Sequence, residues 1–545
     1  MTGIGTKALL LRWIVAIITV AIGRFVYSGY RSRRQIRALR AQGIPIARHS
    51  WILGHIPILL EFRRAHPPDV SPFVSHEWLA ENFRRYAPDV EEPPIVIYLD
   101  FWPGPSFALV SDPDAIPQFT QDRSLRKFSG LVQFFGPLTS GSDIFTSDGE
   151  IWKTWRTRLN PGFSTQNIMT LLPELVEEAR VFAVDLCRLA GPGDTWGPVF
   201  HLKEKATDLT FDISCRLSMD VKPRQQSVSS DTPFKAVFLD QIRLMYLRNH
   251  PFKGRFNALL GSTRARIKKN QNAMCQVLNP LIEAKLLPDT SNTRIKTMID
   301  LALQDEEAKL ASQLDPEFMK TLYDNLNILL YAGYDTTAST ICFMAKSLQD
   351  NADCLAELRA EHDKVLGRFT VSPDAVAAAL IADPQLIFSV PYTTAVIKET
   401  LRLYPLVSTL RHEDCSGFSL LVPDASPTTY PLDGFAVWVA IFNVHRSAKY
   451  WVRPTEFLPQ RWLVPKGDPL YPLKDAWMPF LIGPRACPGQ EMAMTMLKLA
   501  SMFTFRMLDV EEAWSEWDTL RYEQGAAATP SQMVKGQRLL KRLSA

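Results

Sequence analysis

Apolar residues recur with the 3.6-residue period of an amphipathic helix through much of the chain. Long stretches with this period and few glycines lie between about residues 173 and 363. Short runs of strand-forming residues interrupt the pattern at 94–98, 107–110 and 436–442. The sequence contains no internal repeat and no low-complexity tract. The pattern therefore predicts a mainly α fold with a minor β region.

One predicted helix is long and breaks the local rules for helix interiors. Asp315 is a suitable N-cap, Pro316 suits the first turn, and the apolar period continues to about Leu348. In its middle stands Ala-Gly-Tyr-Asp-Thr-Thr, residues 332–337, and glycine inside a helix costs about 1 kcal/mol relative to alanine. A local rule broken in this way indicates a functional position. The alternative is a tolerated kink on a surface turn.

The N-terminal segment is apolar from Ala8 to Tyr30, interrupted by Arg12 and Arg24. A helix of that length just spans a hydrocarbon core of roughly 30 Å if both arginines extend toward the headgroups. A cluster of arginines follows at 31–40, and positive flanks stay on the cytosolic side. We therefore expect a retained anchor over residues 1–30. A cleaved signal peptide is the rival interpretation, and a buried helix of a soluble protein is the third.

Proline and apolar residues dominate the segment from Gly43 to Pro68, which predicts an extended linker from the anchor to the body. The expected organisation is an anchor at 1–30, a basic and proline-rich linker at 31–68, and a single catalytic domain at 69–545. The tail beyond Asp509, which includes Gly-Ala-Ala-Ala-Thr at 525–529, and the irregular insertion at 423–433 match no pattern that we can assign.

Composition and charge restrict the class of protein. The chain has 545 residues, of which 46% are hydrophobic and 22% charged, as in a globular enzyme. The first 60 residues hold nine basic and no acidic side chains, so the remainder carries 61 − 9 = 52 basic against 57 acidic residues. That balance gives no reason to expect a nucleic-acid partner. The seven cysteines are scattered and never spaced as C-x-x-C, which predicts neither a disulfide framework nor a zinc site, and indicates a reducing compartment.

The strongest chemical signal surrounds Cys487. The segment Phe-Leu-Ile-Gly-Pro-Arg-Ala-Cys-Pro-Gly, residues 480–489, precedes a helical pattern from Gln490 to about Leu508. A thiol at a helix start is expected to be acidified by the helix dipole and by backbone N–H groups, which favours the thiolate that binds metals. An isolated cysteine is more often a small buried hydrophobic residue, so the surrounding pattern decides the interpretation.

The pattern Phe-x-x-Gly-x-Arg-x-Cys-x-Gly resembles the haem-binding signature of the cytochrome P450 family. The resemblance implies that Cys487 is the thiolate ligand of a haem b iron, that Arg485 binds a haem propionate, and that Phe480 packs near the sulfur. Two further segments resemble propionate contacts of the family. They supply Trp152 and Arg156, one helical turn apart, and Arg411.

Two more motifs follow in the family's order. Glu399-Thr-Leu-Arg402 and, downstream, Arg461 resemble the two elements of a buried structural triad behind the cysteine loop; alone, the first pair would be a solvated ion pair. Gln460 stands where the family often has glutamate, next to the triad. The segment at 332–337 resembles the family's oxygen-binding groove, in which Asp335 and Thr336 act as acid and alcohol and Gly333 lets the backbone approach the haem.

The resemblance implies a haem-thiolate monooxygenase that inserts one oxygen atom from O₂ into a lipophilic substrate by hydroxylation or epoxidation. The chain has no dinucleotide-binding motif and no length left for a flavin module, so electrons are expected from NADPH through a separate membrane NADPH–cytochrome reductase. Three cations are candidates for docking it: Lys153, Arg158 and Lys498. The expected location is the endoplasmic reticulum membrane, single-pass, with the catalytic domain on the cytosolic side.

The substrate is the least constrained property. Aromatic and aliphatic residues crowd the glycine-interrupted segment 125–145, where they form either core or a lipophilic pocket wall. The overall pattern looks like fungal microsomal members that oxidise secondary metabolites, with fatty-acid or alkane hydroxylation as the alternative. Two other classes stay open: a reductase-independent haem-thiolate isomerase or dehydratase, which tends to lack the acid–alcohol pair, and a non-catalytic haem sensor or binding protein.

Overall fold

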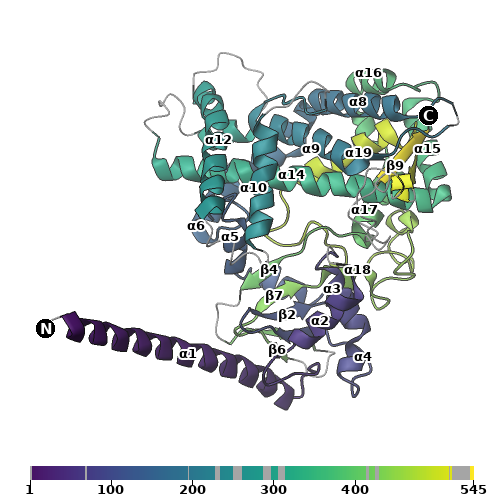
Figure 1. Cartoon of the computed structure of the whole chain (residues 1–545). Coiled ribbons are helices and arrows are strands. Elements are labelled where there is room, and N and C mark those ends of the chain that lie inside the picture. Colours follow the sequence, from purple (N-terminus) through teal and green to yellow (C-terminus); the bar gives the residue numbers. More distant parts are fainter. Residues whose placement is uncertain are drawn as a thin grey trace. The chain divides into compact units, whose positions relative to one another are not determined.

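The chain divides into two compact units in the computed structural model, which describes residues 3–67, 70–193, 195–226, 233–249, 261–286, 296–304, 314–412, 417–423, 429–514, 516–517, 519 and 540–544. Unit 1 consists of Met1–Arg126, Ser408–Val444 and Ile482–Pro484. Unit 2 consists of Lys127–Val407, His445–Leu481 and Arg485–Ala545. Both are coloured along the chain in Figure 1.

Unit 1 contains a four-stranded sheet with the strand order β1-β2-β7-β4. The strands β1 (Val96–Asp100), β2 (Ser106–Val110) and β7 (Ala436–Val439) form on the three predicted strand runs, and β4 is Leu410–His412. The run at 436–442 ends early because α18 (Ile441–Arg446) begins within it. The pairs β1–β2 and β4–β7 are antiparallel, whereas β2 and β7 are parallel. Three short helices, α2 (Ile56–Ala65), α3 (Val74–Glu81) and α4 (Phe83–Tyr86), and the hairpin of β5 (Ser419–Leu421) and β6 (Thr429–Pro431) complete the unit.

The N-terminal helix α1 (Gly3–Ala41) is longer than the predicted anchor. The part from Leu11 is long and apolar enough to cross a membrane, and its most apolar 18-residue window has a mean hydropathy of 1.5 and is fully exposed. That exposure does not fit the third interpretation, a helix buried inside a soluble protein.

The segment predicted as an extended linker has a different structure within its described part. Residues 31–41 continue α1, and α2 occupies Ile56–Ala65. The physical reason is burial, because Ile36, Ile44 and Ile58 all enter the interior of unit 1. Residues 68 and 69 lie outside the described residues. The division at 30 and 68 into anchor, linker and catalytic domain stays a prediction.

Unit 2 is mainly helical, as the sequence predicts. Its longer helices are α8 (Leu172–Leu189), α9 (Leu202–Met219), α10 (Pro233–Arg248), α12 (Gly261–Leu286), α14 (Pro316–Asp350), α15 (Ala352–Leu366), α17 (Pro391–Leu403) and α19 (Gln490–Thr504). The shorter helices include α5 (Ser129–Phe135), α6 (Gly149–Leu159), α7 (Thr165–Thr170), α13 (Met298–Leu303) and α16 (Pro373–Ala382). A small sheet has the order β3-β9-β8, from Phe200–His201, Leu540–Ser544 and Asp509–Glu512. Residues 525–529 of the tail lie outside the described residues.

The helix α14 begins where the sequence predicts. The Asp315 carboxylate accepts a hydrogen bond from the Glu317 N–H, and Pro316 opens the first turn. At 35 residues the helix is about 52 Å long, at roughly 1.5 Å per residue. It packs along α9 and also contacts α19.

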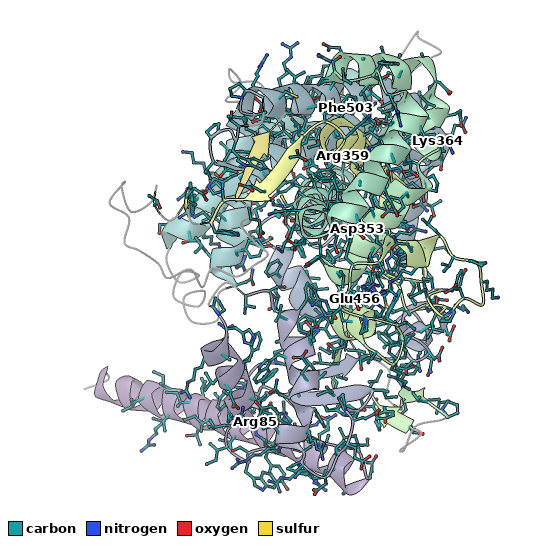
Figure 2. All side chains as sticks on the ribbon, turned by 90° about the vertical axis from the view of Figure 1, so that its right-hand side faces the viewer. Arg85, Asp353, Arg359, Lys364, Glu456 and Phe503 are labelled. Atoms are coloured by element: carbon teal, nitrogen blue, oxygen red, sulfur yellow. The ribbon has the colours of Figure 1, made fainter. Side chains whose placement is uncertain are left out.

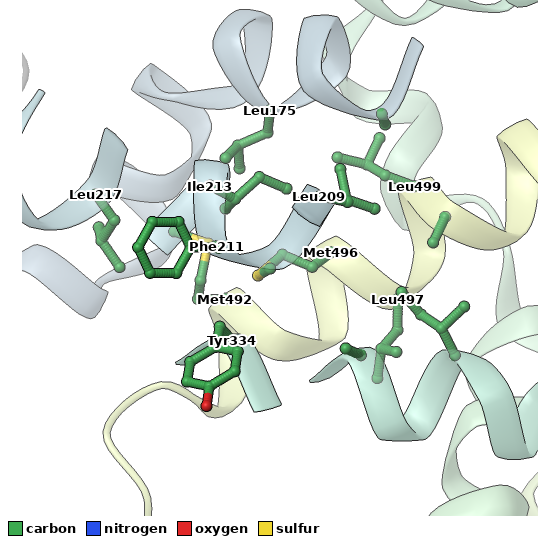
Figure 3. Close-up of a cluster of buried hydrophobic side chains, with 14 of the residues drawn as sticks. Leu175, Leu209, Phe211, Ile213, Leu217, Tyr334, Met492, Met496, Leu497 and Leu499 are labelled. Atoms are coloured by element: carbon green, nitrogen blue, oxygen red, sulfur yellow. The ribbon is translucent and has the colours of Figure 1, made fainter. Parts of the chain in front are cut away.

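The core of unit 2 forms where α8, α9, α14 and α19 meet. Leu209 and Phe211 of α9 lie beside Met492 and Met496 of α19, with Tyr334 of α14 below them (Figure 3). Figure 2 shows Phe503 of α19 enclosed among the helices, whereas Lys364 of α15 points outward. This packing fixes the two helices that carry the predicted chemistry.

Candidate functional site

The Cys487 loop is closed by a backbone hydrogen bond at the start of α19. The Cys487 N–H donates to the Phe480 carbonyl at 2.8 Å. Gly489 is the N-cap of α19, and an added Cβ at that position would lie 3.9 Å from the Cys487 sulfur. Cys487 as a residue is exposed. The loop therefore places Cys487 at the N-terminus of α19, and the helix begins after the cysteine as the sequence predicts.

The pKa of the Cys487 thiol differs from the sequence-based expectation. Desolvation by surrounding protein raises the pKa, and the Gly489 backbone N–H and the Arg156 charge lower it by less, so the net direction is upward. The acidifying N–H group that the sequence predicts is present at Gly489, but desolvation of the sulfur by the surrounding protein outweighs its effect on the pKa. A thiol that coordinates a metal ion is deprotonated, so a bound metal ion would hold this side chain as the thiolate.

Two arginines and a tryptophan surround the loop. The Arg485 guanidinium lies 4.0 Å from the centre of the Trp152 ring and donates to the Ser147 carbonyl at 2.8 Å and to Asp148 at 2.5 Å. Arg156 donates to the carbonyl of Ala486 at 3.0 Å. The structure thus brings Arg485 to two residues of α6, Trp152 and Arg156, that precede it by more than 300 positions.

The charge of this cluster fits the anionic edge of the haem predicted from the resemblance. Burial lowers the pKa of Arg156, and it lowers that of Arg485 to about 10 even though Asp148 raises it. The half-buried Arg156 and the buried side chain of Arg485 share one carboxylate, that of Asp148, which leaves an excess of positive charge next to Cys487. A ligand that offers carboxylates to Arg156 and Arg485 and a metal to Cys487 would offset that excess. The residues present therefore fit a haem.

The other two predicted cofactor residues occupy different surroundings. Phe480 contributes its carbonyl to the loop, and its ring contacts Trp477 at a centroid distance of 6.1 Å. Arg411 lies on β4 in unit 1, where it is 1% exposed. The proposed contacts of the Phe480 ring with the sulfur and of Arg411 with a propionate stay predictions.

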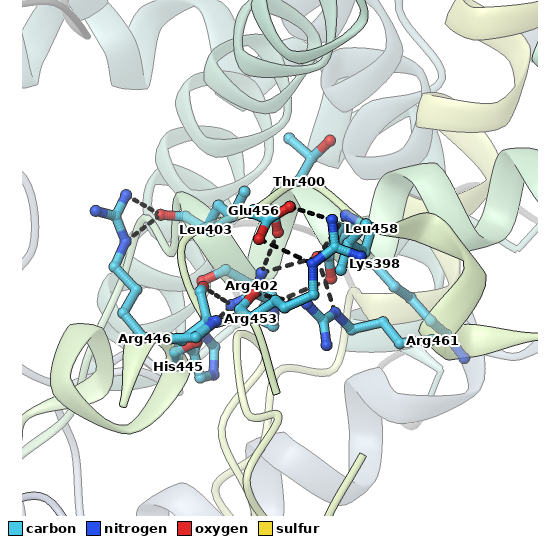
Figure 4. Close-up of polar contacts among 12 residues, drawn as sticks. Lys398, Thr400, Arg402, Leu403, His445, Arg446, Arg453, Glu456, Leu458 and Arg461 are labelled. Atoms are coloured by element: carbon cyan, nitrogen blue, oxygen red, sulfur yellow. Dashed lines mark hydrogen bonds and ion pairs between the residues drawn. The ribbon is translucent and has the colours of Figure 1, made fainter. Parts of the chain in front are cut away.

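The predicted triad forms a buried ionic cluster (Figure 4). The Glu399 carboxylate accepts from Arg402 at 2.8 and 2.9 Å and from Arg461 at 3.0 Å, and the side chains of all three are 0% exposed. It also accepts from the Trp462 ring N–H at 3.1 Å and the Leu458 N–H at 3.0 Å. The remaining guanidinium nitrogens donate to backbone carbonyls of His445, Pro454, Glu456, Val452 and Arg453. This pairing explains how three charges are accommodated without solvent.

His445 connects this cluster to the cysteine segment, a role that the sequence did not indicate. Its Nε2 accepts from the Met478 N–H at 3.0 Å, and its Nδ1 lies 3.1 Å from the Arg402 carbonyl. Burial and the Arg402 charge lower its pKa to about 3. The Leu481 N–H in turn donates to the Met478 carbonyl at 2.9 Å. The sequence carries no sign of this role, because contacts between segments this distant leave no local signal.

On α14, Asp335 pairs with a lysine that the sequence analysis also missed. Lys203 of α9 donates to the Asp335 carboxylate at 2.8 Å, to its carbonyl at 2.8 Å and to the Ser339 hydroxyl at 2.6 Å. The Asp335 side chain is 45% exposed, so it reaches solvent while its charge is paired. The neighbouring Thr336 hydroxyl donates to the Ala332 carbonyl at 2.9 Å. Acid and alcohol are therefore adjacent, and Lys203 orients the acid.

The structure gives a packing reason for glycine at position 333, which differs from the expected approach of the backbone to haem. A Cβ at this position would lie 2.5 Å from the Ser214 hydroxyl oxygen of α9. That hydroxyl donates to the Thr210 carbonyl at 2.7 Å and is fixed by it. Glycine is therefore required for close packing of α14 against α9.

The aromatic segment at 125–145 divides into core and partly covered residues. Phe135 and Leu138 are buried, at 6% and 1% exposure. The partly covered Phe134 ring contacts Tyr246 of α10 at a centroid distance of 5.4 Å, and the Tyr246 hydroxyl lies 2.9 Å from that of Tyr331 on α14. Part of the segment is therefore core, and part is available to line a pocket.

Comparison with known proteins agrees with this geometry. The family model described as cytochrome P450 matches residues 82–534. Cytochrome P450 monooxygenase polC of Polytolypa hystricis is 33% identical over 518 residues, which is 93% of this chain and 88% of the relative. Cytochrome P450 monooxygenase acrF of Aspergillus aculeatus is 30% identical over 440 residues, which is 77% of this chain and 85% of the relative.

A solved structure supports the fold. The crystal structure of a cytochrome P450 superposes with a TM-score of 0.64 at 18% sequence identity, covering 88% of this chain and 99% of that one. At that identity the likeness concerns the fold alone. The predicted fold class, mainly α with a minor β region, is confirmed.

Proposed function

The chain belongs to the cytochrome P450 family and is an oxidoreductase that incorporates oxygen from O₂, and we propose that it oxidises a lipophilic secondary metabolite at the membrane surface. Haem, which the family implies, supplies O₂ activation and transfer of one oxygen atom when its iron carries a thiolate ligand. The proposed reaction is hydroxylation or epoxidation. Fatty-acid or alkane hydroxylation is the alternative.

One observation supports the proposal most directly: Cys487 lies next to two partly or fully buried guanidinium groups that share a single carboxylate. In the proposed assignment Cys487 holds the iron, and Arg156 and Arg485 hold the carboxylates of the cofactor, with Trp152 fixing the Arg485 plane at 4.0 Å. The Glu399, Arg402 and Arg461 cluster then keeps the loop in place through His445.

Protons in this proposal come from α14. The Thr336 hydroxyl already donates to the Ala332 carbonyl, so its oxygen is oriented to accept a hydrogen bond from water. Asp335 reaches solvent and carries the proton, and Lys203 holds its carboxylate in a fixed rotamer at 2.8 Å. Because a reductase-independent isomerase needs no such relay, the Asp335–Thr336 pair favours monooxygenation.

Electrons are proposed to come from NADPH through a separate membrane reductase. Of the three candidate docking cations, Lys153 on α6 is exposed. The Arg158 side chain donates to the Ala302 carbonyl at 3.2 Å, and Lys498 is partly buried near Phe388, so both are less available. Lys153 is therefore the best candidate of the three.

The proposed location is the endoplasmic reticulum membrane, with α1 as a single span and the catalytic part in the cytosol. The support is the exposed apolar part of α1 and the arginines that follow it. A lipophilic substrate would reach such an enzyme from the bilayer, and the rings of Phe134, Tyr246 and Tyr331 offer it an aromatic surface with two hydroxyl groups.

The test is O₂ consumption by the full-length protein in vesicles with NADPH, added reductase and candidate lipophilic substrates, with product analysis by mass spectrometry. Monooxygenation predicts uptake that depends on both reductase and substrate and that Thr336→Ala and Asp335→Asn abolish. Turnover of a hydroperoxide without reductase would instead establish the isomerase class. Haem binding without either activity would establish a sensor.

A further inference from the structure

The segment 134–147 of unit 2, which leads from α5 to α6, is held by side chains of other helices rather than by backbone pairing with them. Among the described residues, its backbone-to-backbone hydrogen bonds outside α5 stay within the segment, as do those from Leu138 and Thr139 to the Phe135 carbonyl at 2.7 and 2.8 Å. Polar side chains of α10, α12 and α14 bond to peptide groups along its length. We call residues 134–147 the strap.

Amide side chains hold the first half of the strap by its carbonyl groups. Gln241 of α10 and Gln271 of α12, two helices that lie side by side (Figure 1), both donate to the Pro137 carbonyl, the second at 2.9 Å. Asn327 of α14 donates to the Leu138 carbonyl at 3.4 Å. Because a carbonyl only accepts hydrogen bonds, each amide must turn its NH₂ group toward the strap. Side chains of three helices therefore meet at two consecutive carbonyls.

Two acceptors on α14 hold the second half of the strap by its N–H groups. The Asp324 carboxylate accepts from the N–H groups of Ser140 and Ser142 at 2.9 and 3.4 Å, and also from the Ser140 hydroxyl. The Asn325 amide oxygen accepts from the Ile144 N–H at 2.9 Å. Both acceptors are buried, at 6% and 1% exposure, so water reaches neither of them while the strap lies against α14.

The Asp324 charge is stabilised by the strap itself. In the part of the chain that the structure describes, its hydrogen-bond partners all lie on the strap. Desolvation raises the pKa of Asp324, and the Ser140 hydroxyl and N–H lower it by less. A buried carboxylate that lost these donors would bear the full cost of desolvation, and bonds to a charged acceptor are stronger than bonds between neutral groups. Asp324 is therefore the strongest single fastening of the strap.

The strap carries aromatic rings toward the surface that we propose for the substrate. The Phe135 ring lies 5.5 Å from that of Tyr331 on α14 and 5.2 Å from that of Phe145, measured between centroids. Tyr331 is four residues after Asn327, so both lie on the same face of α14. Phe145 directly follows the Ile144 N–H that α14 holds. Releasing the strap from α14 would therefore move an aromatic wall of this surface.

We propose that Asp324 is a positioning residue for the oxidation: it fixes the strap against α14, so that this wall keeps one shape and does not open to admit the substrate. The proposal rests on the proposed function, because it takes these rings as the surroundings of the substrate. Asp324 contacts neither substrate nor cofactor in this account and acts through Phe135 and Phe145. A wall of one shape restricts the orientations of a bound substrate, which predicts a narrow distribution of products.

Hydrogen–deuterium exchange of the full-length, haem-loaded protein in detergent, followed by mass spectrometry, measures whether the strap is fixed. In the wild type, residues 138–146 should exchange at least about a hundredfold more slowly than the same peptide unfolded, because buried acceptors hold their N–H groups. Asp324→Ala should raise that exchange by at least about tenfold, the factor for one charge-assisted hydrogen bond. Ser140→Ala, which removes the hydroxyl alone, should raise it less.

The matched control is Glu317→Ala, about two turns earlier on α14, where the carboxylate is 68% exposed and pairs with Lys320. This variant should leave exchange in the strap unchanged. Wild-type exchange as fast as that of the unfolded peptide would overturn the proposal, whatever the enzyme oxidises. Faster exchange along the whole of α14 in Asp324→Ala would also overturn it, because the residue would then hold the fold rather than the strap.

Turnover tests the positioning role separately. With NADPH, added reductase and a substrate that the wild type oxidises, Asp324→Ala should give more products and at least about twofold less product per O₂ consumed, whereas Glu317→Ala should change neither. A released strap with an unchanged distribution of products would overturn the positioning role. If the wild type oxidises no candidate substrate, the proposed function fails, and the exchange experiment alone decides whether Asp324 fixes the strap.

Discussion

Replacing Glu399 by glutamine should destabilise unit 2 more than any change at an exposed ion pair. The carboxylate neutralises part of two buried guanidinium groups and accepts five hydrogen bonds, from Arg402, Arg461, Trp462 and Leu458. Glutamine removes the charge and turns an N–H₂ group toward N–H donors. Breaking a buried pair on one side costs about 3–5 kcal/mol.

The expected change in melting temperature follows from chain size. With an unfolding entropy of about 2.1 cal/mol/K per residue, 545 residues give roughly 1.1 kcal/mol/K, so the midpoint should fall by about 3–4 °C. The assay is thermal unfolding of the full-length protein in detergent, followed by circular dichroism at one scan rate.

The control makes the same glutamate-to-glutamine substitution at an exposed ion pair. Glu317 pairs with Lys320 at 3.2 Å on α14, with side chains 68% and 46% exposed. Such a pair contributes about 0–1 kcal/mol, so Glu317→Gln should shift the midpoint by less than about 1 °C. Equal shifts for Glu399→Gln and Glu317→Gln would refute the claim that the buried triad stabilises the fold.

Three further predictions concern the site and the packing around it. Lys203→Met should lower the product formed per O₂ consumed by about tenfold, because one charge-assisted hydrogen bond to Asp335 is worth about 1.5 kcal/mol. An unchanged ratio of product to O₂ would exclude a positioning role for Lys203. Gly333→Ala should lower stability by about 1–3 kcal/mol, because the added methyl group contacts the Ser214 hydroxyl. In thermal unfolding, the double variant with Ser214→Ala should regain most of that stability. If it regains none, the strain lies elsewhere. The free energy of unfolding should fall as pH drops below about 6.5, because four buried histidines, whose pKa is lowered to about 3, gain protons on unfolding. Asp212, whose pKa burial raises to about 7, partly offsets this loss of stability. Denaturant titration at several pH values measures the change, and a free energy of unfolding that is flat between pH 6.5 and 5 would contradict the prediction. These histidines are His55, His76, His362 and His445.

Features encoded locally were predictable from the sequence. The start of α14 at Asp315 and Pro316, the three strand runs of unit 1 and the helix after Cys487 depend on neighbouring residues alone. Trp152 and Arg156 lie one turn apart on α6, so their shared direction follows from helix geometry.

Features that depend on contacts between distant segments were not predictable. Lys203 precedes Asp335 by 132 positions, and no local pattern in α9 marks it as a partner. His445 acquires its role from Met478 and Arg402. The raised pKa of Cys487 likewise comes from the surrounding protein, which the sequence does not display.

Residues 31–41, which the sequence assigns to the linker, continue α1 for a related reason. Their arginines indicate a solvated segment, but Arg33 is 2% exposed because Asp100, on a strand 67 positions away, pairs with it. Charge count alone therefore misplaces a residue whose partner comes from another element.

The measurement that tests the central claim most directly is the spectrum of the reduced protein with carbon monoxide. With Cys487 as the thiolate ligand of haem iron, the wild-type protein should show the red-shifted thiolate band, and Cys487→Ala should lose it while still folding by circular dichroism. A Cys487→Ala protein that keeps the red-shifted band would contradict the assignment of the ligand.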